Sequence, residues 1–324
     1  MGEPLIQTIN LKKYFNTPKG LLHAVDGVNI SVDKGQTLGV VGESGCGKST
    51  LGRVILRLID ATDGQVLYKG QDILKFSNRE VKSLRKEMQI IFQDPYASIN
   101  PRMSVSEIIG EPLVIHKVYK SKHDLQKRVE ELMDTVGLAQ RLVNTYPHEL
   151  DGGRRQRIGV ARALAMNPEF IVCDEPVSAL DVSIQAQILN LMMDLQEELG
   201  LTYIFITHDL SVVKHISNDI TVMYLGQCVE QANSDAIFEE PMHPYTKSLL
   251  KAIPVPDISY KGKKREILHG EVTSPINPAP GCRFYNRCPY ASEQCKAPVV
   301  QREIKPGHFV SCHLYDNGAT ESVL

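Results

Sequence analysis

Long apolar runs are missing from this chain of 324 residues, and none approaches the roughly 18 residues that suggest a membrane-spanning helix. The N-terminus also lacks the uninterrupted apolar stretch of a secretory signal, so we expect a cytoplasmic protein. An excess of one charge is absent too: 36 Lys and Arg face 38 Asp and Glu, for a formal net charge of -2. No overall basic surface for nucleic acid is indicated, and an anionic ligand must be bound at a local site.

Segments with the composition of buried strands recur along the chain. They are short, rich in Val, Ile and aromatic residues, and cover residues 37–41, 88–92, 170–173, 203–207 and 220–224. Helical patterns lie between several of them. In one, apolar residues recur at helical spacing over 184–199, with Ser183 as the expected N-cap and Gly200 just past the end. Strands that alternate with helices predict an α/β fold with a mostly parallel sheet.

Two changes in composition predict the domain organisation. A helical block from about residue 105 to about residue 138 interrupts the alternation, which predicts an inserted helical subdomain over about residues 100–165. Beyond residue 253 the chain is rich in Pro, Gly and charge, which is unsuited to regular structure. We therefore expect one domain over residues 1–253, and a linker with a small Cys-rich extension over residues 254–324. A basic run at 261–265 is interpreted as a solvated linker rather than a lipid or partner contact.

A phosphate-binding loop follows the first predicted strand. Residues 42–49 read GESGCGKS, which fits the pattern G-x-x-x-x-G-K-[ST] between a strand and a helix. Glycines let backbone N–H groups surround phosphates at a helix N-terminus. Lys48 is expected to reach the β- and γ-phosphates, and the Ser49 hydroxyl is expected to bind Mg²⁺.

Two carboxylates end the predicted strand at 170–173. This position suits Asp174 for binding Mg²⁺, mostly through water, and suits Glu175 for polarising an attacking water. Two acids at a strand end are also compatible with simple solvation. The phosphate loop upstream favours the functional interpretation, because the two motifs together are typical of a nucleoside triphosphatase.

With these motifs the sequence resembles the ATP-binding-cassette ATPases over about its first 250 residues, which implies a P-loop ATPase core. In that family a Gln after a strand senses Mg²⁺ and the water, and Gln93 is similar to it. His208 resembles the family's γ-phosphate switch histidine, and Asp181 lies in a loop similar to its dimer-contact loop. The expected catalytic residues are Glu175, His208 and Gln93, and the expected Mg²⁺ ligands are Ser49, Gln93 and Asp174. The expected ATP-binding residues are Tyr14 (with Phe15 as the alternative aromatic), Gly42, Ser44, Gly45, Cys46, Gly47, Lys48, Ser49, Thr50, Asp151, Gly152, Gly153 and Asp181.

The helix-opening signature departs from the family. Where the family has L-S-G-G-Q, residues 150–154 read LDGGR, so Asp151 and Arg154 replace Ser and Gln. A carboxylate cannot donate the hydrogen bond that the Ser makes to the γ-phosphate of the opposite subunit. We therefore expect a heterodimer with a paralogous ATPase, in which the site closed by Asp151 is slow. Alternatively Asp151 only caps the following helix, and Arg154 or Arg155 offsets its charge.

The end of the first domain resembles one branch of the family. His243, Pro244 and Tyr245 lie in a segment similar to the ATPases of oligopeptide, dipeptide and nickel importers. That resemblance implies two membrane permease subunits, a solute-binding protein acting indirectly, no nucleic acid partner, and a peripheral position at the cytoplasmic face of the membrane. Peptides are the favoured solute, with nickel or another small solute as the alternative. A soluble ATPase of DNA repair and a redox sensor are weaker hypotheses.

Four cysteines gather near the C-terminus. Cys282, Cys288, Cys295 and Cys312 are separated by five, six and sixteen residues, without the C-x-x-C pairs of zinc ribbons. We expect a [4Fe-4S] cluster, which some similar proteins carry there; Zn²⁺ and unligated or oxidised thiols are the alternatives. Bound metal would stabilise an extension with little core of its own. Because the phosphate loop is distant in sequence and is expected in a separate domain, we expect Cys282→Ser and Cys312→Ser to loosen the extension more than they disturb ATP binding.

Overall fold

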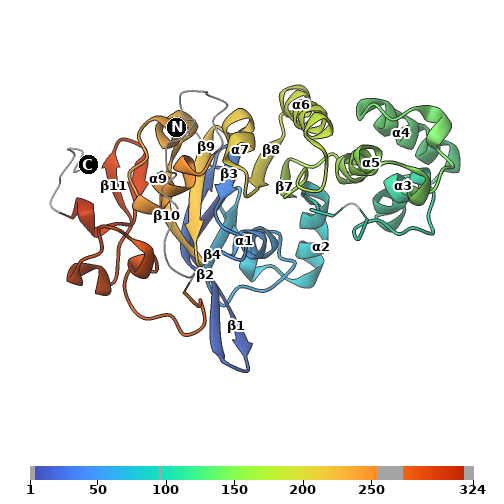
Figure 1. Cartoon of the computed structure of the whole chain (residues 1–324). Coiled ribbons are helices and arrows are strands. Elements are labelled where there is room, and N and C mark those ends of the chain that lie inside the picture. The colour runs from blue at the N-terminus through green and yellow to red at the C-terminus, as the bar shows by residue number, and fades with distance from the viewer. Residues whose placement is uncertain (1–3, 95, 254–272, 317–324) are drawn as a thin grey trace, which may run out of the picture. The chain divides into compact units, whose positions relative to one another are not determined.

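A computed structural model describes residues 4–94, 96–253 and 273–316 (Figure 1). The described residues divide into two compact units, taken from Met1–Val32, Thr37–Leu74 and Thr207–Leu324 in the first and from Asp33–Gln36 and Lys75–Ile206 in the second. In the first unit the elements are β1 (Ile6–Thr17), β2 (Gly20–Val32), β3 (Thr37–Val41), α1 (Lys48–Ile55), β4 (Asp63–Tyr68), β5 (Gln71–Asp72), α7 (Leu210–Ile216), β9 (Asp219–Tyr224), β10 (Gln227–Asn233), α8 (Ser234–Glu239), α9 (Pro244–Lys251), β11 (Arg302–Lys305) and β12 (His308–Val310). In the second they are α2 (Asn78–Glu87), β6 (Met88–Ile91), α3 (Val105–Ile115), α4 (Lys122–Thr135), α5 (Gly152–Leu164), β7 (Phe170–Asp174), α6 (Val182–Leu199) and β8 (Thr202–Ile206).

The first unit contains two groups of paired strands. One is an antiparallel sheet in the order β2-β1-β4-β5, and the other runs in the order β11-β12-β10-β9-β3. In the second group β3 pairs with β9 in parallel, and the remaining neighbours are antiparallel. Every residue of β3 is buried, which explains why this strand is a continuous apolar run in the sequence. β3 leads directly into the predicted phosphate loop.

The second unit contains the parallel strands β8, β7 and β6 in that order, together with its helices. All residues of β7 and β8 are buried. Helices α3, α4 and α5 pack on one another in the region where the sequence predicts helices. They belong to the same compact unit as β6–β8, so a separate helical subdomain over about residues 100–165 stays a prediction.

Local patterns predicted the α/β elements closely, but the prediction of a mostly parallel sheet is wrong, because β1, β2, β4 and β5 pair antiparallel and so do β9, β10, β12 and β11. All five segments expected as buried strands are β3, β6, β7, β8 and β9, with ends within two residues of the prediction. The N-cap expected at Ser183 is wrong. Helix α6 starts at Val182, because the Asp181 carboxylate accepts hydrogen bonds from the N–H groups of Ser183 and Ile184 at 3.1 and 3.0 Å. Gly200 ends the helix in a left-handed conformation, as the sequence indicates.

The described part of the C-terminal extension joins the first unit. Strand β12 pairs with β10, where Glu230 lies opposite Val310. Phe284 is only 1% exposed and packs with Tyr224 and Tyr245 in one aromatic cluster. Residues 273–316 therefore share their core with the phosphate-loop unit. The predicted boundary at residue 254 lies outside the described residues, as does the basic run at 261–265. In the described part of the chain, no helix is both long enough and apolar enough to cross a membrane.

Candidate nucleotide site

Steric constraints set the shape of the loop between β3 and α1. Gly42 has φ 149° and Gly47 has φ 103°, in the region that side chains rarely adopt. A Cβ at Gly42 would lie 2.1 Å from the carbonyl oxygen of Met223, and one at Gly47 would lie 2.0 Å from that of Ala24. Both positions therefore require glycine, and the spacing of the motif follows from backbone packing.

The loop opens onto a helix end suited to anions. Helix α1 begins at Lys48, and no side chain caps its N-terminus. Its first N–H groups and the predicted ligands Ser49 and Thr50 are therefore placed where a phosphate binds. The buried Lys48 ammonium donates to the carbonyls of Gly42 and Glu43 at 2.8 and 3.0 Å, so it lies over the loop. These features fit the binding of a nucleoside triphosphate.

Two predicted catalytic residues meet in the second unit. Asp174 ends β7 and is 3% exposed, and Glu175 follows it. Gln93 Nε2 donates to Glu175 Oε2 at 2.9 Å, although the two residues are 82 positions apart. Glu175 has φ 48°, which is costly for a residue with a side chain. The unit thus brings together a carboxylate and an amide that can orient a water.

His208 belongs to the first unit and is positioned by its neighbour. Thr207 N–H donates to the carbonyl of Val40 in β3 at 3.2 Å. His208 therefore follows a residue fixed to the strand that leads into the phosphate loop. Asp209 next caps α7 by accepting from the N–H of Ser211 at 2.8 Å. The γ-phosphate role of His208 stays a prediction.

Tyr14 lies in an aromatic and charged group that the sequence did not indicate. Its ring stacks on His23 with centroids 4.0 Å apart, and its hydroxyl donates to Asp26. Burial and then the Asp26 hydrogen bond raise the pKa of Tyr14. Burial would raise the pKa of Asp26, but hydrogen bonds from Tyr14 and His23 and the charge of Arg283 hold it below its usual value. The partly exposed Asp26 carboxylate therefore orients the ring predicted to stack on adenine.

The altered signature is a helix cap in the structure. Asp151 Oδ1 accepts from the N–H of Arg154 at 2.8 Å, which confirms the capping interpretation. Asp151 Oδ2 also lies 3.3 Å from the Arg154 guanidinium, so Arg154 offsets its charge. Arg155 is 6% exposed, donates to the Pro147 carbonyl at 2.6 Å and lies over the Tyr96 ring. Arg154, rather than Arg155, is therefore the residue that offsets the charge of Asp151.

Four predicted ATP-binding residues share one cavity in the second unit. Its volume is about 290 Å³, and its lining includes Asp151, Gly152, Gly153 and Asp181. A Cβ at Gly153 would lie 2.7 Å from Ile184, so close packing against α6 requires glycine there. The signature and the predicted dimer-contact loop are therefore adjacent on one surface.

The His-Pro-Tyr segment supports the phosphate loop. His243 Nδ1 accepts from the N–H of Tyr245 at 3.1 Å and so caps α9, with Pro244 as its first residue. Burial lowers the pKa of His243 to about 4, which keeps the ring neutral as this acceptor role requires. The Tyr245 hydroxyl accepts from the N–H of Glu43 at 2.9 Å. The motif thus contacts the phosphate loop directly.

The four C-terminal cysteines lie in the same unit, and the described chain forms no disulfide. Burial raises the pKa of Cys312 to about 12, and the charges of Cys282, Cys288 and Cys295 add to the shift. No group of three or more His, Cys, Asp or Glu among the described residues is arranged to hold a metal ion.

The expectation that Cys282→Ser and Cys312→Ser loosen the extension more than they disturb ATP binding stays a prediction, but the extension contacts the phosphate loop directly although the two are distant in sequence. Arg287 donates to both carboxylate oxygens of Glu43, in the phosphate loop, at 2.9 and 3.0 Å. These residues are 244 positions apart, and no local pattern signals their pairing.

Comparisons with known proteins agree with these motifs. Residues 25–178 match the family "ABC transporter", and residues 229–295 match "Oligopeptide/dipeptide transporter, C-terminal region". The chain is 52% identical to the putative oligopeptide transport ATP-binding protein YkfD of Bacillus subtilis, over 98% of each chain. It is also 52% identical to the oligopeptide transport ATP-binding protein OppF of Salmonella typhimurium, over 93% of this chain and 90% of that protein. The ATP-binding cassette MJ0796, solved with ADP and Pi, is 28% identical with a TM-score of 0.64, over 71% of this chain and 98% of that chain.

Proposed function

Because this chain belongs to the ABC transporter family and is an ATPase coupled to transport, we propose that it energises the import of peptides. The main support for peptides as the solute is sequence similarity: over nearly its whole length the chain is 52% identical to proteins named for oligopeptide transport. The match of residues 229–295 to the oligopeptide/dipeptide region supports it.

Each unit is assigned its own part of the chemistry. In the first unit, Lys48 and the N–H groups of α1 hold the phosphates, and the Ser49 hydroxyl is an oxygen ligand of the kind that Mg²⁺ prefers. In the second unit, Asp174 offers a carboxylate oxygen of the same kind, and Mg²⁺ when bound would neutralise charge on the transferred phosphoryl group. Glu175, held by Gln93, accepts a proton from the attacking water and orients it for in-line attack. His208 contacts the γ-phosphate.

The partners follow from the same proposal. Two cassettes dimerise head to tail, this chain with a paralogous ATPase, and bind two permease subunits at the cytoplasmic face of the membrane. A solute-binding protein delivers the peptide to the permeases.

Peptide-stimulated hydrolysis tests this function. In proteoliposomes that hold the chain with its paralogue and permeases, adding a peptide-loaded binding protein should raise ATP turnover by about tenfold, since productive closure requires the loaded complex. Loading the same binding protein with Ni²⁺ is the control. Stimulation by Ni²⁺ but not by peptide would overturn the peptide assignment and leave the ATPase intact.

For the four cysteines we propose a [4Fe-4S] cluster rather than zinc. The support for this choice is the sequence spacing: four thiols separated by five, six and sixteen residues lack the C-x-x-C pairs of zinc ribbons, and four cysteine thiolates would ligate a [4Fe-4S] cluster.

Metal analysis tests the cluster. Anaerobically purified protein should be brown and hold iron and labile sulfide at about four each per chain. The Cys288→Ser variant should lose most of both, whereas Cys173→Ser, at a buried cysteine of the second unit, should keep them. Colourless protein with one zinc per chain would refute the proposal.

A further inference from the structure

Residues 282–288 connect the cysteine group to two parts of the candidate nucleotide site. This seven-residue segment begins at Cys282 and ends at Cys288, and it contains Arg283, Phe284 and Arg287. All of its contacts described below lie within the first unit. Its position makes it a physical link between the cysteines and the ATP-binding loops.

Arg287 holds the phosphate loop. Its side chain is 6% exposed, and its two terminal nitrogens donate to the two oxygens of Glu43 at 2.9 and 3.0 Å. A bidentate charge-assisted pair fixes both direction and distance. One of these nitrogens also donates to the Tyr224 hydroxyl at 3.3 Å. Because Glu43 follows Gly42, the pair restrains the loop at its first turn.

Arg283 holds the Tyr14 group. Its side chain is 5% exposed and donates to Asp26 and to the carbonyl of Leu225. Asp26 in turn accepts the Tyr14 hydroxyl and faces His23. Arg283 is thus the cation that compensates Asp26, the carboxylate bonded to the hydroxyl of the Tyr14 ring that is predicted to stack on adenine.

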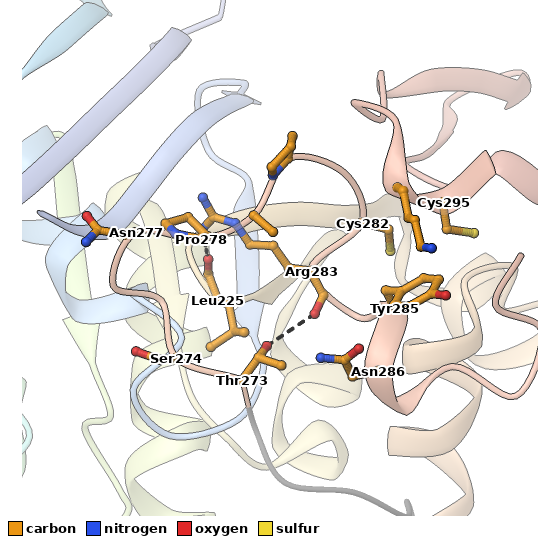
Figure 2. A pocket seen from close by; sticks show the side chains of 13 residues that line it. Leu225, Thr273, Ser274, Asn277, Pro278, Cys282, Arg283, Tyr285, Asn286 and Cys295 are labelled. Atoms are coloured by element: carbon orange, nitrogen blue, oxygen red, sulfur yellow. Dashed lines mark hydrogen bonds between the residues drawn. The ribbon is translucent and has the colours of Figure 1, made fainter. Parts of the chain in front are cut away.

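The segment is anchored between these two arginines. Phe284 is 1% exposed. Its ring centroid lies 5.3 Å from that of Tyr224 in a T-shaped arrangement and 5.4 Å from that of Tyr245. Cys282 N–H donates to the carbonyl of Cys295 at 2.8 Å, so the backbone of the segment is joined to a second cysteine. Figure 2 shows Arg283 in the same pocket of about 480 Å³ as Cys282 and Cys295. A change at Cys282 or Cys288 therefore acts on the two ends of the segment that carries both arginines.

We propose that Arg287 and Arg283 are positioning residues for ATP, and that an intact cysteine group is required for them to hold the nucleotide loops. Arg287 positions the phosphate loop, and Arg283 positions the ring that receives adenine. This inference rests on the proposed ATP site. It assigns the C-terminal extension a role in nucleotide affinity.

Two ligands separate the roles of the arginines. In the assembled complex, Arg287→Ala should weaken binding of ATP and of inorganic triphosphate alike by about tenfold, because only the phosphate loop is released. Arg283→Ala should weaken ATP by a similar factor and leave triphosphate nearly unchanged. Arg287→Lys, which keeps the charge but loses the bidentate geometry, should recover part of the loss. Competition against a fluorescent ATP analogue measures each affinity.

The matched control is Arg302→Ala. This arginine pairs with Asp316 in the same extension at 2.7 Å, and the described hydrogen bonds of its side chain go to Asp316 rather than to either nucleotide loop. The affinity of the Arg302→Ala variant for ATP should stay within about twofold of that of the wild-type protein. Equal losses from Arg302→Ala and Arg287→Ala would show general loosening of the extension and overturn the positioning role.

A cysteine variant tests the link. Cys288→Ser should weaken ATP binding about as much as Arg287→Ala, and the double variant should lose little more, since both act through one segment. Additive losses, or unchanged affinity in Cys288→Ser, would overturn the link. Wild-type protein that binds no ATP would instead refute the proposed function, so the two failures are distinguishable.

Discussion

The Glu175→Gln variant should bind ATP with near wild-type affinity and hydrolyse it at least about a hundredfold more slowly. Glu175 lies beside Gln93 at the end of a buried strand, in a backbone conformation that strains an ordinary residue. An amide keeps the size and can retain a hydrogen bond to Gln93, but it cannot accept a proton from water. ATP should therefore remain bound, and the nucleotide-sandwiched dimer should accumulate.

The control for this variant lies at the other end of the same strand. Glu169 precedes β7 and pairs with Lys34 at 3.3 Å, so Glu169→Gln removes a carboxylate without touching the proposed chemistry. Single-turnover hydrolysis and size-exclusion chromatography in ATP compare the two variants. Near-normal turnover of Glu175→Gln, or an equal loss in Glu169→Gln, would remove Glu175 from the role of general base.

Local features of this chain were predictable because local physics determines them. Strands buried on both faces, such as β3, β7 and β8, must be continuous apolar runs. Gly42 and Gly47 are fixed by carbonyl oxygens about 2 Å from where a Cβ would stand, so the motif is visible in one sequence. The parallel strands of the second unit also place Gln93 near Glu175, as the family pattern implies.

Side-chain pairs between residues that are far apart in the sequence were not predictable. Nothing near Arg287 indicates that it pairs with Glu43, and nothing near Arg283 indicates Asp26, because the partners are 244 and 257 residues away. The prediction of the α6 N-cap was wrong for a different reason. Asp181 and Ser183 are both good N-caps, and the choice depends on which carboxylate or hydroxyl oxygen reaches two N–H groups.

The Asp151 signature raises the question of whether the two ATP sites of a dimer are equivalent. Two unit charges about 4 Å apart repel by about 4 kcal/mol at an effective dielectric near 20. The structure reduces this value, since Arg154 lies 3.3 Å from Asp151 and the Asp151 side chain is 58% exposed. The cap also occupies the Arg154 N–H at the helix N-terminus, where a phosphate would bind. Together these leave a penalty of about 1 to 2 kcal/mol, or roughly tenfold in rate.

We therefore expect unequal sites in the proposed heterodimer. In a head-to-tail dimer the phosphate loop of this chain faces the signature of the paralogue, and Asp151 faces the phosphate loop of the paralogue. Disabling Glu175 should remove most of the ATP turnover of the transporter, whereas disabling the corresponding glutamate of the paralogue should remove about a tenth. Asp151→Ser keeps a residue that can cap α5 and restores a donor, so it should speed the second site by about tenfold.

The control is Asp124→Ser, which removes an exposed carboxylate from the first turn of α4 in the same unit and should leave both sites unchanged. Turnover is measured in the assembled transporter with one catalytic glutamate disabled at a time, so that each site is observed alone. Equal turnover at the two sites, or a fully active homodimer of this chain, would show that Asp151 serves only as the cap of α5. A gain in Asp151→Ser confined to the site that it closes would instead identify the carboxylate as the cause of the asymmetry, because the cap remains while the charge is gone.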